Sequence, residues 1–465
     1  MNSLYQNDTI IALATPSGAG AIAIIRLSGP DAITMVDAFF KSIHSKKLSS
    51  QKTHTIHLGH IVEDSRVLDE VLVSVFKNPK SYTGEDVIEI SCHGSSYIQQ
   101  EIIQLFVRHG ARIANPGEFT LRAFLNAKLD LSQAEAVADL IASDNKASHQ
   151  IAMQQMRGGF SNEIKVLRDE LLNFASLIEL ELDFSEEDVE FADRKQFEDL
   201  LERIIKVLKH LIDSFSTGNV IKNGIPISII GAPNVGKSTL LNALLNEDKA
   251  IVSDIAGTTR DAIEDEITIE GIKFRFIDTA GIRSTDDTIE SIGIKKTFEK
   301  ITQSQVVLYL LDASKVTTDT IQIFNTDIRK IQEQYPDKQL IVVANKMDEA
   351  DQEFIETSFV FPHTLYTSAK SGLGIDTLKT KLLEFVNTGA LRNNDTIITN
   401  SRHYDSLLKA LSEVQKVQQG MDANLSGDLL AIDIRQALYH FGEITGEITS
   451  DDLLGNIFAN FCIGK

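Results

Sequence analysis

The chain has 465 residues, of which 43% are hydrophobic and 24% are charged, a composition typical of soluble globular proteins with a sizeable core. At roughly 150 residues per domain, this length predicts about three domains. The formal net charge of −21 argues against indiscriminate nucleic-acid binding, because lysine and arginine provide most contacts to a phosphate backbone. Any RNA contact must therefore use a local basic patch or a basic partner protein.

Nothing in the sequence indicates a membrane segment or an oxidising compartment. No run approaches the roughly 18 uninterrupted apolar residues that span a bilayer, and residues 1–8 lack the basic-then-apolar order of a secretion signal. Cys92 and Cys462 lie far apart and outside any C-x-x-C spacing, so neither a disulfide framework nor a zinc cluster is indicated. We expect a protein of the reducing cytoplasm.

The sequence predicts a mixed α+β domain over residues 1–122. Strand-like runs at 21–25 and 71–76 are separated by turns rich in Gly, Pro and Ser. Two polar clusters, at 81–86 and 115–120, predict turns that lead into the next element. The residues alone assign no chemistry to this domain.

The apolar period becomes helical from about residue 123 to 222. Two series recur at alternating steps of three and four, Ile164, Leu167, Leu171, Phe174 and Ile178, and Phe197, Leu201, Ile204, Leu208 and Leu211. Each series forms an apolar stripe on a long helix, and such stripes need each other or a third helix. The acidic stretch 179–190 predicts a solvated connection, and residues 216–224 predict a hinge into the next domain.

Residues 223–386 alternate strand-like and helix-like runs, which predicts a parallel sheet covered on both faces. Helical character resumes near Ser401, within the segment 387–465. The favoured architecture is one all-α domain, built from 123–222 and 387–465, into which the α/β domain is inserted. Two separate helical domains are the alternative.

A phosphate-binding loop is the most informative motif. A β-branched run ends at Gly231, four residues lead to Gly236, and a helix-like stretch follows, as the pattern G-x-x-x-x-G-K-[ST] requires. Inward-turned backbone N–H groups and the positive end of the helix dipole hold phosphate. Lys237 supplies a full charge to the β and γ phosphates, and Ser238 a hydroxyl to Mg²⁺. Alone, this octet is open to a chance match on a surface turn.

Two further motifs downstream serve the γ-phosphate and the metal. Thr258 and Thr259 lie in a polar segment, and Thr259 joins Ser238 in the Mg²⁺ shell when a γ-phosphate is present. A strand-like run then ends in Asp278, which holds Mg²⁺ through water, and Gly281 permits close backbone approach to the γ-phosphate.

Two last motifs serve the base. A strand-like run delivers Asn345, Lys346 and Asp348, and the carboxylate of Asp348 accepts from the ring N–H and the exocyclic amine of guanine. Adenine offers no such pair of donors, so the motif selects GTP over ATP. The predicted GTP contacts are Asn234, Val235, Gly236, Lys237, Ser238, Thr239, Ser253, Thr258, Thr259, Asp278, Thr279, Ala280, Gly281, Asn345, Lys346, Asp348, Ser368, Ala369 and Lys370. The last three are expected to close over the base.

One position departs from the commonest GTPase scheme, in which a glutamine orients the attacking water. Here that position is Ile282, which cannot hydrogen-bond, so hydrolysis must recruit another residue, a cation, a partner or a dimer. Positive charge supplied to the transition state contributes roughly 10³–10⁵ in rate in such systems. Asn234 and the carbonyl-rich loop 253–258 suggest a monovalent cation.

With these residues read, the chain resembles the MnmE (TrmE) family of tRNA-modification GTPases over almost its whole length. The most specific pieces are the runs 116–120 and 125–131 and the tail 461–465, Phe-Cys-Ile-Gly-Lys. The runs 81–86 and 254–261 also carry the resemblance. The GTPase motifs are shared more widely.

The resemblance implies a fold and a function. The expected fold is multidomain α/β, with an N-terminal α+β folate-binding-like domain that dimerises, a central all-α helical domain, and an inserted Ras-like P-loop GTPase domain. A homodimer is expected to form a heterotetramer with a flavin-dependent MnmG-type partner. The assembly adds a carboxymethylaminomethyl (aminomethyl-type) group to carbon 5 of the wobble uridine of certain tRNAs, and 5-formyl- or methylene-tetrahydrofolate supplies one carbon.

Site residues carried over by position extend this expectation. Folate is expected to contact Arg26, Glu89, Lys128 and Lys465, and K⁺ to be held by Asn234 with backbone groups of Ser253, Ile255 and Thr258. Glu290 is expected to position the water that Ile282 cannot, and Cys462 to lie near the modification centre. Without the resemblance, Arg26 and Lys128 would be surface charges and Cys462 a small buried hydrophobe.

Two rival functions belong to other classes. A regulatory GTPase that binds ribosomal RNA during ribosome assembly would be expected to carry an appended basic domain or a second GTPase repeat, and neither is evident. A folate-dependent methyltransferase with a vestigial GTPase domain is disfavoured by the intact Lys237, Asp278 and Asp348.

Overall fold

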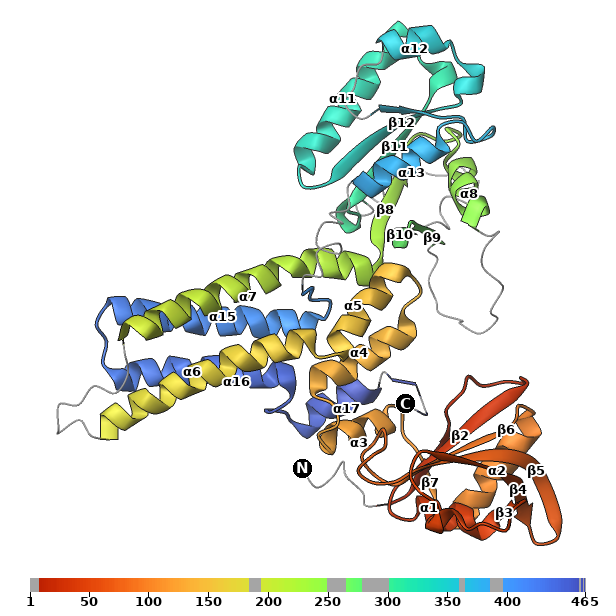
Figure 1. The fold of residues 1–465 in the computed structure, drawn as a ribbon. Helices are drawn as coiled ribbons and strands as arrows, with labels where there is room; N and C mark the ends of the chain where they lie inside the picture. Colours follow the sequence, from red (N-terminus) through yellow and green to blue (C-terminus); the bar gives the residue numbers. More distant parts are fainter. Residues whose placement is uncertain are drawn as a thin grey trace. The chain divides into compact units, whose positions relative to one another are not determined.

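The computed structural model describes residues 8–183, 194–248, 265–277, 301–358, 364–384, 396–459, 461–462 and 464. The chain forms two compact units (Figure 1). The first contains residues 1–142, 152–209 and 402–465, and the second contains residues 143–151 and 210–401. No helix within the described ranges is both long and apolar enough to cross a membrane.

The first unit begins with a seven-stranded sheet in the order β3-β4-β5-β6-β2-β1-β7. Its strands are β1 (Ile10–Leu13), β2 (Ile22–Ser28), β3 (Phe40–Ser42), β4 (Thr55–Glu63), β5 (Arg66–Phe76), β6 (Val87–His93) and β7 (Arg112–Ile113). All neighbours are antiparallel except β1 and β7, which run parallel. The strands predicted at 21–25 and 71–76 are confirmed as parts of β2 and β5.

Alternation along these strands gives the sheet one buried and one open face. Helices α1 (Ala32–Phe39) and α2 (Ser96–Arg108) and the short η1 (Leu48–Ser50) contribute to the core together with inward residues such as Ile25, Val73 and Ile90. The opposite side chains of β2, β4 and β5 include four exposed apolar residues, Ile22, Ile56, Leu58 and Leu72. Leu58 and Leu72 are direct cross-strand partners.

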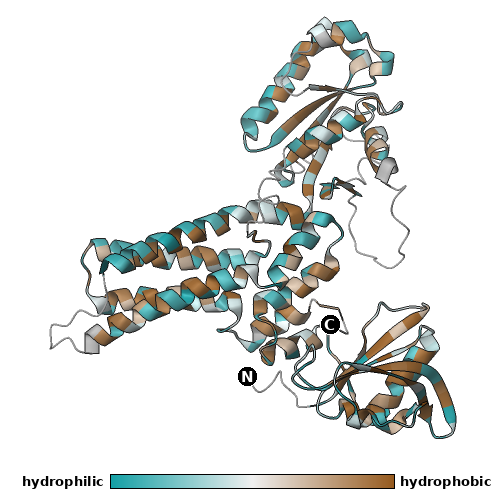
Figure 2. Ribbon diagram, in the orientation of Figure 1, coloured by the Kyte–Doolittle hydropathy of each residue, from teal (hydrophilic) through white to brown (hydrophobic). Residues whose placement is uncertain are grey.

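The helices of the first unit follow the predicted periodicity. They are α3 (Glu118–Leu125), α4 (Leu131–Ala142), α6 (Gly159–Asp183), α15 (Ser401–Asp422), α16 (Gly427–Thr445) and α17 (Asp451–Ala459), joined by parts of α5 (Lys146–Met156) and α7 (Arg194–Asn223). The two predicted stripes are buried apart from Phe174, which is half-buried and stacks on Phe197 with ring centroids 5.0 Å apart. Figure 2 shows hydrophobic and hydrophilic residues side by side on these helices.

Two local predictions here were wrong in part. Residues 179–183 continue α6 and are not a connection, whereas 184–190 lie outside the described residues. The expected hinge at 216–223 is the last part of α7, and the helix ends only at Gly224, whose φ is +78°. Position 218 requires glycine because the backbone of Ile398 packs closely against this helix. A Cβ there would lie 2.0 Å from the Ile398 oxygen.

The second unit is built on a six-stranded sheet in the order β13-β12-β11-β8-β10-β9. Its strands are β8 (Ile225–Ile230), β9 (Asp265–Ile269), β10 (Ile272–Phe276), β11 (Val306–Asp312), β12 (Gln339–Asn345) and β13 (Thr364–Tyr366). Only the β9–β10 pair is antiparallel. The strand order changes direction at β8, and ligands of such sheets bind beyond the carboxyl ends of the strands near that point.

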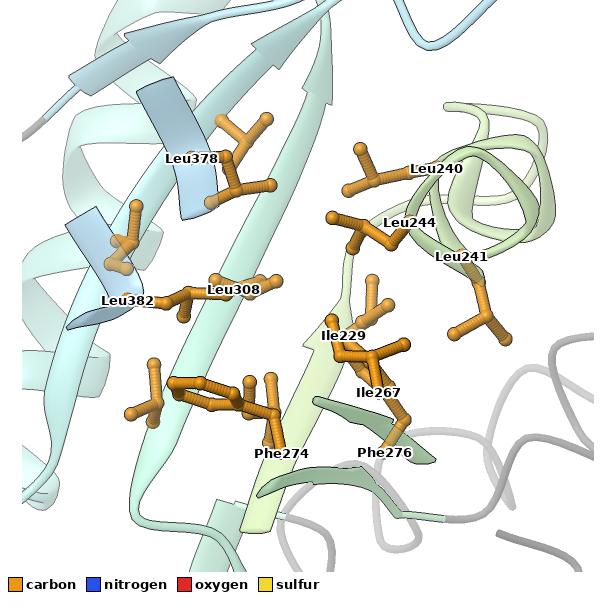
Figure 3. Close-up of a cluster of buried hydrophobic side chains, with 14 of the residues drawn as sticks. Ile229, Leu240, Leu241, Leu244, Ile267, Phe274, Phe276, Leu308, Leu378 and Leu382 are labelled. Carbon is orange, nitrogen blue, oxygen red and sulfur yellow. The ribbon is translucent and has the colours of Figure 1, made fainter. Parts of the chain in front are cut away.

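Helices cover both faces of this sheet, as the alternating runs predicted. Helices α8 (Lys237–Asp248) and α13 (Ile375–Glu384) pack with Leu308 and Leu310 of β11 on one face (Figure 3). Helices α11 (Thr318–Gln334) and α12 (Gln352–Ser358) pack with Val307 and Leu311 on the other. Strand β11 is buried along its whole length, as expected for a central strand of a parallel sheet.

Candidate functional site: a nucleotide cradle and an N-terminal arginine pocket

The phosphate loop connects β8 to α8 and requires glycine at both of its ends. Gly231 has φ +149°, and a Cβ there would lie 2.3 Å from the Leu310 oxygen. Gly236 has φ +97°, and its Cβ would lie 2.4 Å from Nδ2 of Asn345. Either side chain would displace the neighbouring strand ends, so the two glycines set the shape of the loop. Asn234, between them, is exposed and also has positive φ, at 63°.

Lys237 starts helix α8 and its side chain returns over the loop. Its Nζ donates to the carbonyl oxygens of Gly231 at 2.9 Å and Ala232 at 3.0 Å. The half-buried Ser238 and the exposed Thr239 follow in the first turn of the helix. A full positive charge, two hydroxyls and the N-terminus of a 12-residue helix therefore converge at one place, an arrangement that suits a phosphate group.

Asn345, at the end of β12, hydrogen-bonds to the phosphate loop. Its Nδ2 donates to the Val235 oxygen at 2.9 Å, and its Oδ1 accepts from the Ala369 N–H at 3.0 Å and from the Thr367 hydroxyl at 3.3 Å. The side chain is buried, with 2% of the residue exposed. One amide thus joins the phosphate loop to the segment 367–370, which was predicted to close over the base.

The adjacent Lys346 adopts a left-handed φ of +65°. Its Nζ donates to the Asn234 oxygen at 2.9 Å and to Oδ2 of Asp312 at 2.7 Å. Burial alone would raise the pKa of Asp312, but hydrogen bonds from Lys346 and Ser314 hold that pKa below its ordinary value. Asp312 was not predicted as a site residue. The sequence signal that could have identified it is an aspartate at the end of an apolar, strand-like run.

The remaining residues of the two base motifs lie close to Asn345 and Lys346. Asp348 is exposed within the short η4 (Met347–Glu349). The Met347 N–H donates to the Thr367 oxygen at 3.1 Å, so the segments that carry Asp348 and Ser368 adjoin. Ser368 and Ala369 are buried, and Lys370 is exposed. The structure therefore brings together the predicted residues of the loop, of 345–348 and of 368–370.

The rest of the predicted nucleotide, metal and catalytic set lies outside the described residues. This set comprises Ser253, Ile255, Thr258, Thr259, Asp278, Thr279, Ala280, Gly281 and Glu290, and the predicted folate residue Lys465 is also outside.

A second candidate site surrounds Arg26 on β2. Its guanidinium is 5.5 Å from the ring centre of Tyr82 and 5.6 Å from that of Phe119. Glu89, its partner in the β2–β6 register, accepts through Oε1 from Nε at 2.9 Å, and the same oxygen lies 2.7 Å from Nη2. Only 15% of the Arg26 side chain is exposed, so this arginine is not a free surface charge. Two neighbouring aromatic rings, and one Glu89 oxygen that faces two guanidinium nitrogens, hold it in one orientation.

The C-terminal tail reaches the same place. Nη1 of Arg26 donates to the Gly464 oxygen at 3.4 Å, and the Gly117 N–H donates to the Cys462 oxygen at 3.3 Å. Gly464 has φ +95°, and a Cβ there would lie 2.2 Å from the Leu13 oxygen. Cys462 itself is exposed, so it is not a buried hydrophobe.

Lys128, predicted beside Arg26, contacts a neighbouring loop instead. Its Nζ donates to the Pro79 oxygen at 2.8 Å. Asn126 donates to the Thr83 oxygen at 2.7 Å, which attaches the same segment to the loop that carries Tyr82. Within the described residues, no hydrogen bond joins Lys128 to Arg26 or Glu89.

A buried charge network supports this site and was missed from the sequence. Arg122, with 3% of its side chain exposed, is 2.6 Å from Asp8, 3.2 Å from Glu85 and 3.1 Å from Glu118. Burial raises the pKa of Glu118, but Arg112 and the Asn115 N–H outweigh burial and lower it. The two polar clusters do lead into β6 and α3, as predicted, and they are also cross-linked through Arg122.

Comparison with known proteins matches both parts of the chain. A family model described as the GTP-binding protein TrmE N-terminus matches residues 9–128, and one described as the MnmE helical domain matches residues 131–462. A protein of Christiangramia forsetii named tRNA modification GTPase MnmE is 68% identical over 99% of each chain. Proteins of the same name from Flavobacterium johnsoniae (67% identical, 99% of this chain and 100% of that one) and Bacteroides fragilis (54%, 98% and 99%) are also similar. On this full-length identity and the match of both domain models, the chain belongs to the MnmE (TrmE) family of tRNA modification GTPases.

Proposed function

We propose that the chain is a potassium-activated GTPase that takes part in tRNA wobble-uridine modification. The observation that carries the proposal is the phosphate loop braced by Asn345, in a chain whose relatives bear the name tRNA modification GTPase. Gly231 and Gly236 support the proposal, because they let the loop pack against Leu310 and Asn345 in a shape that a side chain at either position would disturb.

The proposed roles at the nucleotide follow the chemistry of the side chains. Lys237 binds the β and γ phosphates, and Asp348 selects guanine. Mg²⁺, held by Ser238 and Thr259 and through water by Asp278, supplies charge neutralisation when bound. Asn345 and Lys346 keep the loop and the base segment in register, so that less order has to be gained on binding.

A potassium ion is proposed beside the phosphates, held by Asn234 and by backbone groups of Ser253, Ile255 and Thr258. When bound, it supplies positive charge next to the transition state. Glu290 is proposed to orient the attacking water, because Ile282 cannot. Asn234 is exposed and its backbone has a left-handed conformation within the phosphate loop. This accessibility supports its role as a ligand of such an ion.

The N-terminal pocket is proposed to bind the folate one-carbon donor, 5-formyl- or methylene-tetrahydrofolate. Arg26, Glu89, Lys128 and Lys465 are its proposed contacts, and Cys462 lies near the reacting carbon. A cation between aromatic rings suits a flat, anionic ligand.

The proposal assigns a role to each domain. Residues 1–122 bind folate and dimerise, 223–386 form the GTPase domain, and 123–222 with 387–465 form the helical domain. The open apolar face of the N-terminal sheet, with Leu58 opposite Leu72, supports a second copy of the chain as its cover. An MnmG-type flavoprotein completes a cytoplasmic heterotetramer.

GTP hydrolysis tests the cation. The initial rate is measured for the purified chain in KCl and in NaCl at equal ionic strength, and we expect hydrolysis at least ten-fold faster in KCl. Equal rates in the two salts would remove the potassium site from the proposal.

Nucleoside analysis tests the biological role. Transfer RNA from a strain that lacks the gene is digested and its wobble uridines are compared with those of the complemented strain. We expect the aminomethyl-type groups to disappear and to return on complementation. Unchanged wobble uridines would favour the ribosome-assembly alternative.

A further inference from the structure

One part of the N-terminal sheet domain has the opposite charge balance to the rest of the chain. Acidic residues make up 66 of 465, about one in seven. The 23 residues from 40 to 62 contain four lysines, Lys41, Lys46, Lys47 and Lys52, and no acidic residue. The segment 71–84 adds Lys77 and Lys80, again without an acidic residue.

These two segments lie together in the fold. Nζ of Lys77 donates to the Ser49 oxygen at 2.8 Å, and its backbone N–H donates to the Thr53 hydroxyl at 3.0 Å. The Lys80 N–H donates to the Lys77 oxygen at 2.8 Å. The turn that carries Lys80 is therefore attached to the loop that carries Lys46, Lys47 and Lys52.

The same surface continues to the candidate folate site. Lys128 donates to the Pro79 oxygen, one residue before Lys80. We define the lysine ridge as Lys46, Lys47, Lys52, Lys77, Lys80 and Lys128. All are exposed except the half-buried Lys77.

Carboxylates do not neutralise the ridge within the described part of the chain. None of its lysines forms an ion pair with a described carboxylate. Two acidic side chains that adjoin these segments bond to the backbone: Asp37 accepts from the Leu48 and Ser49 N–H groups, and Asp86 accepts from the Asn78 N–H. Burial is the main cause that lowers the pKa of His57, and the charge of Lys46 lowers it further. The second contribution is the one expected from nearby positive charge.

We propose that the lysine ridge binds the phosphate backbone of the substrate tRNA and directs it toward the Arg26 pocket. Exposed lysines that lie together on one surface suit backbone phosphates. The inference rests on the proposed function and adds to it a direct contact of this chain with tRNA.

Charge reversal on the ridge, in the full-length chain, tests this contact. The variant Lys46→Glu/Lys47→Glu/Lys52→Glu is compared with Lys165→Glu/Lys206→Glu/Lys209→Glu, which makes the same charge change at exposed helix positions. Lys128 is left unchanged because it is a proposed folate contact. The dissociation constant of a fluorescent, transcribed tRNA is measured by anisotropy from 25 to 200 mM KCl.

The ridge variant should bind tRNA at least ten-fold more weakly at low salt. The slope of log K against log [KCl] should fall by roughly 2, since each lost phosphate contact removes about 0.7–0.9. The control variant should change affinity less than two-fold, and Lys46→Arg/Lys47→Arg/Lys52→Arg should bind like the unchanged chain. Equal losses in both reversal variants, or no loss in the ridge variant, would overturn the proposal.

Three parallel measurements separate this inference from its alternatives. GTP hydrolysis by the ridge variant should be unchanged, and wobble modification by the unchanged chain tests the proposed function independently. Binding of monoglutamyl and pentaglutamyl 5-formyltetrahydrofolate is measured as well. If the ridge variant loses only the preference for pentaglutamate and keeps its tRNA affinity, the ridge binds the folate tail and the proposal is wrong.

Discussion

Asp312, the last residue of β11, holds Lys346 against the phosphate loop. Its Oδ2 is 2.7 Å from Nζ of Lys346, and the same ammonium donates to the Asn234 oxygen at 2.9 Å. A carboxylate outside the nucleotide motifs thereby fixes a lysine within one of them.

Asp312→Asn should weaken nucleotide binding because Lys346 would lose its charged partner. We expect the dissociation constants of GTP and GDP to rise about ten-fold, the effect of one charge-assisted hydrogen bond. Isothermal titration calorimetry measures both constants. Asp319→Asn, an exposed aspartate in the first turn of α11, should leave them unchanged, and equal effects of the two substitutions would contradict the role given to Asp312.

Asp348→Asn should change base specificity. The amide can donate to the 2-oxo group of xanthine but cannot accept from both guanine donors, so GTP affinity should fall and xanthosine triphosphate affinity should rise. Competition with a fluorescent nucleotide reports both. Glu349→Gln, the exposed neighbour, serves as the matched control. Normal GTP binding by Asp348→Asn would show that the guanine pocket is elsewhere.

Arg26→Lys should weaken folate binding although the charge is kept. Lysine cannot place two nitrogens at Oε1 of Glu89 or present a planar cation to the rings of Tyr82 and Phe119. We expect the dissociation constant of 5-formyltetrahydrofolate to rise at least ten-fold while GTP hydrolysis is unchanged.

The matched control for that prediction is Arg66→Lys in the same domain. Arg66 pairs with Glu101 and lies over Tyr97 at 5.8 Å, so it is a second arginine with a glutamate and an aromatic partner, and 52% of its side chain is exposed. Loss of folate binding in both variants would indicate a general effect on the domain.

Glu135 should make the first unit sensitive to acid. Burial raises the pKa of Glu135, but His403 and Arg402, each 2.7 Å away, lower it to about 2. Because the folded pKa lies below the ordinary value of 4.5, this carboxylate stabilises the fold above pH 4.5. That contribution is lost as the pH falls toward 2. Thermal melts between pH 6 and 3 should show a falling melting temperature.

Glu135→Gln tests the source of that acid sensitivity. Removing one partner of a buried pair should cost about 3–5 kcal/mol of unfolding free energy, and the acid sensitivity should shrink. Glu179→Gln removes the exposed pair with Arg435 and should cost about 0–1 kcal/mol. Chemical denaturation at pH 7 gives both values, and equal costs would refute the assignment.

Sequence reasoning succeeded where the signal is local or periodic. The stripes of α6 and α7, the runs that became β2, β5, β10 and β12, and the glycines of the phosphate loop are such cases. It failed where the cause is a distant neighbour. Gly218 and the polar residues around it predict a hinge, yet the close backbone of Ile398 makes this a packed helix.

The same limit explains the missed site residues. Asp312 meets a lysine 34 positions later, and Arg122 meets an aspartate 114 positions earlier. Neither pair leaves a spacing that a reader of the sequence could recognise. Both depend on which strand or helix ends meet in space.

The Arg122 network restricts how this protein can diverge. Asp8, Glu85, Glu118 and Arg112 surround or share the partners of one buried guanidinium. Replacing Arg122 would remove the cation shared by the buried Glu85 and Glu118, although replacing the whole set by apolar side chains could be tolerated. Mutations at these positions are therefore expected to be inherited together or to be eliminated, so that three segments distant in the gene evolve as one unit.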